Sequence, residues 1–209
     1  MSSIDSGAPA SVGSVLCLAC GMCCDGTMFR DVELQSGDDS GALAAGGISI
    51  RSWRRRGPGG MVSGQSFTQP CAVLGGDCRC GIYLLRPGHC RNFDCALLQA
   101  RHRGEVTERH ALRSIRQARQ LADTIRERLV ELGDLERHRP LTQRVRRTQR
   151  RIFSGQWPAG LDRERAAECF GELAAAVGEL QLKLRLEFYP DSPGALAPVR
   201  PTLGPSERR

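Results

Sequence analysis

Eight cysteines in the first half of the chain constrain its fold more than any other feature. Four of them form a C-x2-C-x2-C-C segment and four follow after a long gap; the eight are Cys17, Cys20, Cys23, Cys24, Cys71, Cys80, Cys90 and Cys95. Thiols at this density are either oxidised to disulfides or bound to metal, because a cluster of free thiols would be reactive. The choice between disulfides and metal therefore decides what kind of domain this is.

The N-terminal segment favours metal over disulfides. Residues 1–15 contain no basic residue and no apolar stretch long enough for a signal peptide. Nothing downstream approaches the roughly 18 consecutive apolar residues of a membrane span. We therefore expect a cytoplasmic protein with no membrane contact, since reduced thiols grouped in that compartment more often bind metal. Structural disulfides are the alternative.

Residues 15–98 are predicted to form a Cys-rich module that needs metal to hold it together. The segment has few large apolar residues and many turn formers, so hydrophobic burial alone could hardly fold it. The alternation in Thr27–Leu34 predicts a short strand. Residues 36–69, rich in Gly and Arg, predict an elaborate loop with a short helix near Gly41–Ala45. The expected fold is a small irregular metal-stapled module with short strands, short helices and long loops.

Residues 105–188 are predicted to form an all-α helical hairpin or three-helix region. The first helix has an apolar stripe at alternating steps of four and three: Ala111, Ile115, Ala118, Ala122, Ile125, Leu129 and Leu132. Gly133 ends it, a second helix follows Pro140, and Asp162 is the expected N-cap of a third. The stripes favour packing within one chain, and a coiled-coil homodimer or another protein partner is the alternative. We expect a disordered N-terminus over residues 1–14 and a flexible tail over residues 189–209.

The formal net charge of +7 is concentrated in the helical part. Residues 101–152 carry 15 arginines against 7 acidic residues, and their run R-V-R-R-T-Q-R-R at 144–151 has the charge to bind phosphates. Apolar Val145 and Ile152 interrupt or flank the run, which favours a solvated helix face. Nucleic acid is therefore a partner that the sequence allows but does not favour.

The spacing of the thiols is typical of metal ligands. Two thiolates separated by two residues can chelate one ion, because the turn directs both sulfurs to the same side. Adjacent Cys23 and Cys24 differ, since neighbouring side chains point apart; they serve different metals, or one of them bridges. Eight thiolates fill two four-coordinate sites or build one cluster with shared sulfurs. Zinc, iron and an iron–sulfur cluster all accept such ligands.

Residues beside the second cysteine group are expected to support the metal ligands. The guanidinium groups of Arg86 and Arg91 are placed to offset thiolate charge, and Tyr83 offers a hydroxyl to a sulfur or a carbonyl. Cys78, two residues before Cys80, is a candidate extra ligand or a free thiol. Cys169, in the third helix, is expected to be a small buried hydrophobic residue.

The complete motif resembles a known family. It consists of C-L-A-C-G-M-C-C at residues 17–24, P-C-A-V-L at 70–74 and C-G-I-Y-L-L-R-P-G-H-C-R-N-F-D-C at 80–95. This pattern is similar to the YkgJ-like cysteine-cluster family, described as zinc- or iron-chelating domains. The resemblance covers about residues 15–98 and implies that the eight cysteines bind the metal. Members are often labelled iron–sulfur oxidoreductases, and a similar cluster accompanies flagellin lysine methylases. This chain departs from the family in its long Gly/Arg-rich insertion before Cys71, and its helical tail lies outside the resemblance.

The sequence therefore predicts a zinc- or iron-binding protein whose thiolate centres have a structural or chelating role. One alternative is an iron–sulfur oxidoreductase or redox sensor. Another is a nucleic-acid or partner-binding protein that uses the Arg-rich helices, with the metal as scaffold. The chain has no P-loop, no H-E-x-x-H motif and no recognisable nucleophile–base pair, so catalytic residues are unknown and enzymatic activity stays open.

Overall fold

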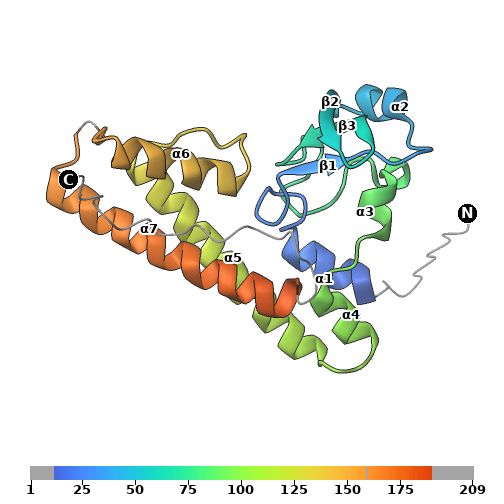
Figure 1. The fold of residues 1–209 in the computed structure, drawn as a ribbon. Coiled ribbons are helices and arrows are strands. Elements are labelled where there is room, and N and C mark those ends of the chain that lie inside the picture. The colour runs from blue at the N-terminus through green and yellow to red at the C-terminus, as the bar shows by residue number, and fades with distance from the viewer. Residues whose placement is uncertain (1–11, 159, 190–209) are drawn as a thin grey trace, which may run out of the picture.

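The computed structural model describes residues 12–158 and 160–189. The predicted flexible tail lies outside the described residues except for residue 189. The predicted disordered N-terminus lies outside them except for residues 12–14, which stand at the start of helix α1 (Val12–Cys20). Figure 1 shows two long helices side by side, with a smaller lobe of strands and short helices at one end.

The smaller lobe is a three-stranded antiparallel sheet covered by short helices. The strands β1 (Asp31–Glu33), β2 (Arg51–Gly57) and β3 (Gly60–Thr68) have the order β1-β3-β2. Helices α2 (Ser40–Ala45) and α3 (Gly88–Asn92) belong to the same lobe (Figure 1). Its buried core is small and consists of Val32, Leu43, Ile48 and Phe67. The prediction of a small module of short strands and helices is confirmed.

The loop predicted for residues 36–69 is wrong over most of its length. The predicted short helix is present as α2, but the Gly/Arg-rich insertion forms the β2–β3 hairpin, with Pro58 and Gly59 between the paired residues Gly57 and Gly60. The hairpin is largely exposed, so it lacks the apolar alternation that identifies a half-buried strand. Charged contacts stabilise it instead. Arg55 forms an ion pair with Glu33 at 2.8 Å, and its guanidinium lies 4.2 Å from the Trp53 ring centroid.

The helical part agrees with the periodicity of the sequence. It contains α4 (Ala96–His102), α5 (Glu108–Glu131), α6 (Leu141–Phe153) and α7 (Arg163–Lys183), which continues as a π-helical segment, Leu184–Phe188. Asp162 is the N-cap of α7, as predicted, because its carboxylate accepts a 2.7 Å hydrogen bond from the backbone N–H of Arg165. Among the described residues, no helix has the length and apolar character needed to cross a bilayer.

The apolar stripes of α5 and α7 pack against each other within one chain. Ile125 and Leu129 of α5 and Leu173 and Leu180 of α7 are buried in one large cluster. Helices α1 and α4 also pack on α5. The buried cluster therefore extends into the first cysteine segment, where it includes Leu16, Cys20 and Met22. The long helices thus form the support on which the cysteine-rich lobe is built.

Candidate metal centre

The first four cysteines lie at the end of α1 and in the turn that follows it. Gly21 ends the helix with φ +66, a left-handed conformation that glycine adopts without strain, and its N–H donates to the carbonyl of Cys17 at 2.9 Å. The N–H of Cys24 then donates to the carbonyl of Gly21 at 2.9 Å. This tight turn brings Cys17, Cys20 and Cys23 to one neighbourhood, as a C-x2-C metal-binding turn does.

The eight thiols fall into two neighbourhoods of four. In the first, which we call the first thiol group, burial raises the pKa values and the charges of the other members raise them further; its members are Cys17, Cys20, Cys23 and Cys95. The second thiol group consists of Cys24, Cys71, Cys80 and Cys90; burial raises the pKa values of Cys24, Cys71 and Cys90, and the charges of other members raise them further. Adjacent Cys23 and Cys24 belong to different groups, although the charge of Cys24 also raises the pKa of Cys23.

Packing divides the thiols in the same way. Cys20, Cys23 and Cys95 lie in or against the large helical cluster, whereas Cys71 and Cys90 lie against the small core of the sheet. The backbone joins the two neighbourhoods, because the N–H of Cys71 donates to the carbonyl of Cys24 at 2.8 Å. Each group therefore has its own supporting core.

The donor chemistry of both groups fits a thiophilic metal. Burial raises the pKa of Cys20 and of Cys24 to about 12, and that of Cys90 to about 11, so these thiols are neutral near pH 7 without a cation. A bound metal would supply the positive charge that makes neighbouring thiolates stable. No three Cys, His, Asp or Glu side chains of the described residues converge closely enough to hold one ion. Metal binding would therefore require the thiols of a group to move closer together.

An unpartnered hydroxyl beside the first thiol group supports the same fit. Tyr189 is only 8% exposed, and its hydroxyl has no hydrogen-bond partner. Burial raises its pKa above the ordinary value, and the charges of Cys23, Cys95 and Cys20 raise it further. The ring packs edge-on against Phe29, with 6.0 Å between centroids. A buried O–H without an acceptor is costly, and a metal-bound thiolate is an acceptor that would satisfy it.

Sequence reasoning missed Tyr189. The residue follows α7 and lies about one hundred positions beyond the last of the eight cysteines, outside the motif. No local pattern marks it, since a single Tyr before Pro190 is an ordinary helix end. Only the fold brings it to the thiols, because α7 runs back along α5 toward α1 and α4 (Figure 1).

The predicted supporting residues differ in what they contact. Arg86 lowers the pKa values of Cys17 and Cys90 through its charge, against the larger effect of burial, so it acts on both thiol groups. Its guanidinium lies 3.8 Å from the ring centroid of Tyr83, which is 56% exposed and makes no hydrogen bond to a sulfur among the described residues. Arg91 instead faces the carboxylate of Asp38 at 3.9 Å. Arg86 is therefore the member of the predicted set that interacts with the thiols.

Cys78 lies against the turn of the first thiol group. Its sulfur accepts a 3.2 Å hydrogen bond from Arg119, which also donates to the carbonyl of Cys20 at 3.0 Å. A Cβ at Gly21 would approach this sulfur to 2.7 Å, so the contact requires glycine there. Arg119 thus connects α5, the end of α1 and the loop before Cys80. Cys169 is fully buried in α7, as predicted.

The fold thus has two neighbourhoods of four thiols, the first beside the helical core and the second beside the core of the sheet. A family model named CxxCxxCC, described as "Putative zinc- or iron-chelating domain", matches residues 16–115. The matched residues make up about half of the chain, and the YkgJ-like resemblance is consistent with this match. No match was found among curated proteins or among solved structures. The matched residues run from α1 into the first turns of α5 and include both thiol groups.

Proposed function

We propose that the protein binds zinc or iron in two sites of four thiolates each, with a structural or chelating role. The first site would use the first thiol group, and the second site the second. The family match supports metal binding of this kind over residues 16–115. Four thiolates around one ion leave no open coordination position for a substrate, which favours a structural or storage function over catalysis.

The observation that carries the proposal is the division of the thiols into two sets of four. Electrostatic interactions support this division, and packing agrees for the five thiols that lie in or against a core. The adjacent pair Cys23 and Cys24 is split between the sets. One cluster with shared sulfurs would instead need thiols from both sets around the same metal atoms. Two sites with one metal ion each therefore explain this arrangement more simply than one cluster with shared sulfurs.

The test is the metal content of variants, each lacking one thiol. The protein is purified without oxygen, and zinc and iron are measured per chain. We expect about two ions in the natural protein, and about one after Cys17→Ser or Cys80→Ser, because each change removes one of four ligands from one site. Cys169→Ser is the matched control, since that thiol is buried in α7 and belongs to neither set. Full metal content in both ligand variants would falsify the proposal.

An optical spectrum of the same samples identifies the type of centre. Zinc thiolate sites are colourless, whereas iron–sulfur clusters absorb visible light. We expect each single Cys→Ser variant, from either set, to lose half of the metal, or half of the visible absorbance, relative to the natural protein. A visible cluster lost completely after either single change would instead support one shared iron–sulfur centre, and with it the redox alternative.

A further inference from the structure

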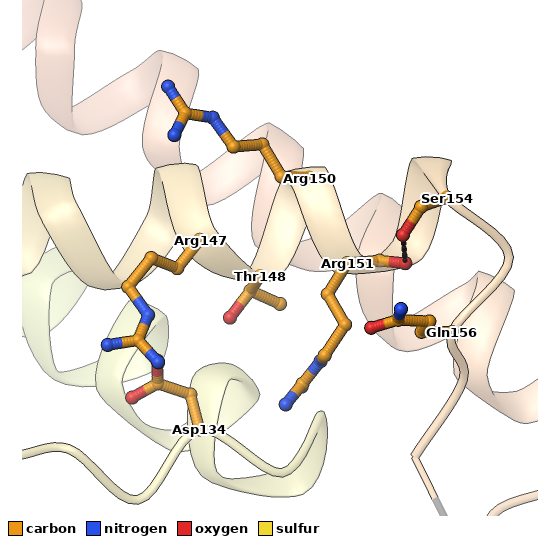
Figure 2. Close-up of a pocket in the computed structure, with 7 residues that line it drawn as sticks. All are labelled: Asp134, Arg147, Thr148, Arg150, Arg151, Ser154 and Gln156. Carbon is orange, nitrogen blue, oxygen red and sulfur yellow. Dashed lines mark hydrogen bonds between the residues drawn. The ribbon is translucent and has the colours of Figure 1, made fainter.

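A hollow of about 440 Å³ lies between α6 and the connection from α5 to α6. It is far along the chain from the cysteine motif and is lined by polar and charged groups, including Asp134, Arg147, Thr148, Arg150 and Arg151. Figure 2 shows Thr148 at the centre of this lining, with its hydroxyl directed into the space between Arg147 and Arg151. The lining therefore comes mainly from the arginine run at residues 144–151.

Two buried polar atoms of this lining lack a partner. Thr148 is 1% exposed and its Oγ1 makes no hydrogen bond. The Nε of Arg151 is also buried without a partner. Leaving such a group unpaired is destabilising, so unpaired buried groups are rare in folded proteins. Both atoms can donate a hydrogen bond.

The arginines of the hollow are held in place by the protein. Arg151 donates from its terminal nitrogens to the carbonyls of Leu132 and Gly133, which leaves its Nε–H free. Arg147 forms an ion pair with Glu136. A guanidinium fixed in this way loses little conformational freedom when it binds a ligand.

The side chains that line the hollow carry a net positive charge. Asp134 is the acidic member, and its carboxylate is already paired with buried Arg144, at 2.8 Å from Arg144 Nε. Arg150 forms no ion pair with any described residue, and in Figure 2 its guanidinium extends along the outer side of α6. The lining therefore has more basic than acidic side chains, together with hydrogen-bond donors.

We propose that this hollow binds a small tetrahedral oxyanion, namely a phosphate ion or a phosphate monoester group. Thr148 Oγ1 and Arg151 Nε donate to its oxygens, and Arg147 and Arg150 contribute charge. Donors of this kind suit an oxyanion, because charge-assisted hydrogen bonds to phosphate are about twice as strong as neutral ones. The site is independent of the proposed metal sites, since its lining contains none of the eight thiols.

A single small ligand fits the geometry better than a nucleic-acid backbone. A polynucleotide needs a row of basic groups in register with its repeating phosphates. Here Arg144 is buried with Asp134, so the run does not present an unbroken row of exposed charge. The proposed donors line a single hollow instead.

The test is a calorimetric titration of the metal-loaded full chain with inorganic phosphate, at fixed ionic strength maintained with sodium chloride. We expect saturable binding, weakened about tenfold by Thr148→Val, the scale of one charge-assisted hydrogen bond. Arg150→Gln should also weaken it. Arg146→Gln is the matched control, because Arg146 is exposed on the same helix and outside the lining, and the change in charge is identical.

Three results would overturn the proposal. The first is the absence of saturable phosphate binding by the natural protein at fixed ionic strength. The second is an equal loss in Arg146→Gln and Arg150→Gln, which would indicate a general field of positive charge. The third is binding of a short oligonucleotide by a protein that does not bind inorganic phosphate, which would identify the arginine run as a nucleic-acid surface. Because Arg150→Gln changes an exposed side chain, a folding defect in Thr148→Val would leave the test intact.

Discussion

At the residue scale, three side chains that act on cysteines come from different parts of the chain. Tyr189 follows the last long helix, Arg86 lies between the second-group cysteines, and Arg119 belongs to α5. Tyr189 is the most informative of the three, because its buried hydroxyl lacks a partner and three first-group thiols act on it. In a thiolate site, such a donor would stabilise the charge on sulfur and hold the ligand in position.

Removing only this hydroxyl should weaken the first metal site. We expect Tyr189→Phe to lower metal affinity there by roughly 10–100-fold, the range for groups that hydrogen-bond to metal ligands, and to leave the second site unchanged. Competition with a chelator measures both sites. Tyr83→Phe is the control, since the Tyr83 ring is 56% exposed and stacks on Arg86. Equal affinity in Tyr189→Phe and the natural protein would show that the hydroxyl does not contact a metal ligand.

The sequence alone indicated which eight cysteines are candidate metal ligands. Their division into two thiol groups could be inferred only from the fold. Spacing predicts that Cys17, Cys20 and Cys23 lie close together, because the intervening turn is local. Cys95 joins them only because α4 follows it directly and packs on α1 and α5. Spacing alone therefore left one shared cluster and two sites as equal alternatives.

At the scale of elements, α5 positions the first cysteine segment through its arginines. Arg126 donates to the carboxylate of Asp25 at 2.9 Å and to the hydroxyl of buried Thr27 at 2.8 Å. We expect Arg126→Ala to lower the free energy of unfolding by about 1–3 kcal/mol, because it leaves Thr27 and Asp25 without this partner. Chemical denaturation measures the change. Arg116→Ala, at an exposed position of the same helix, should have little effect, and equal effects would contradict this role.

The contact between α5 and α7 supplies most of the apolar burial. Leu173 is 1% exposed, so Leu173→Ala should lower the free energy of unfolding by about 2–5 kcal/mol through lost burial and a residual cavity. Leu182→Ala, at a position that is 59% exposed, should change it by less than about 0.5 kcal/mol. Thermal or denaturant unfolding of the two variants makes the comparison. Similar values for the two would mean that the stripes do not pack within one chain.

Helices were predictable from the sequence, and so was a short strand within Thr27–Leu34, which contains β1, but the two hairpin strands were not. The stripe of α5 repeats over seven positions, and such long periodicity identifies a buried helix face without knowledge of its partner. The β2–β3 hairpin has no comparable signal, because its strands are rich in Arg, Gly and Ser and face solvent. Its order depends on contacts across the sheet, such as the ion pair between Arg51 and Asp31, that only the fold brings together.

At the scale of the whole molecule, the two thiol groups rest on cores of very different size. The first group adjoins the large cluster formed by α1, α4, α5 and α7, which is stable through its own apolar burial. The second group adjoins a core of four buried apolar residues, Val32, Leu43, Ile48 and Phe67. A core of that size contributes little stability alone, so the sheet lobe would depend on its metal far more than the helices do.

Metal removal should therefore loosen the molecule unevenly. After treatment with a chelator under reducing conditions, we expect amide hydrogen exchange to accelerate strongly in β1, β3 and α3, while α5 and α7 keep most of their protection. The physical reason is that no metal then links the second-group thiols across the lobe, and the small core cannot compensate. Cys80→Ser should reproduce the loosened lobe with metal present, whereas Cys169→Ser should not. Uniform loss of protection through α5 and α7 would mean that the metal supports the whole fold, and unchanged protection everywhere would mean that the sheet lobe folds without it.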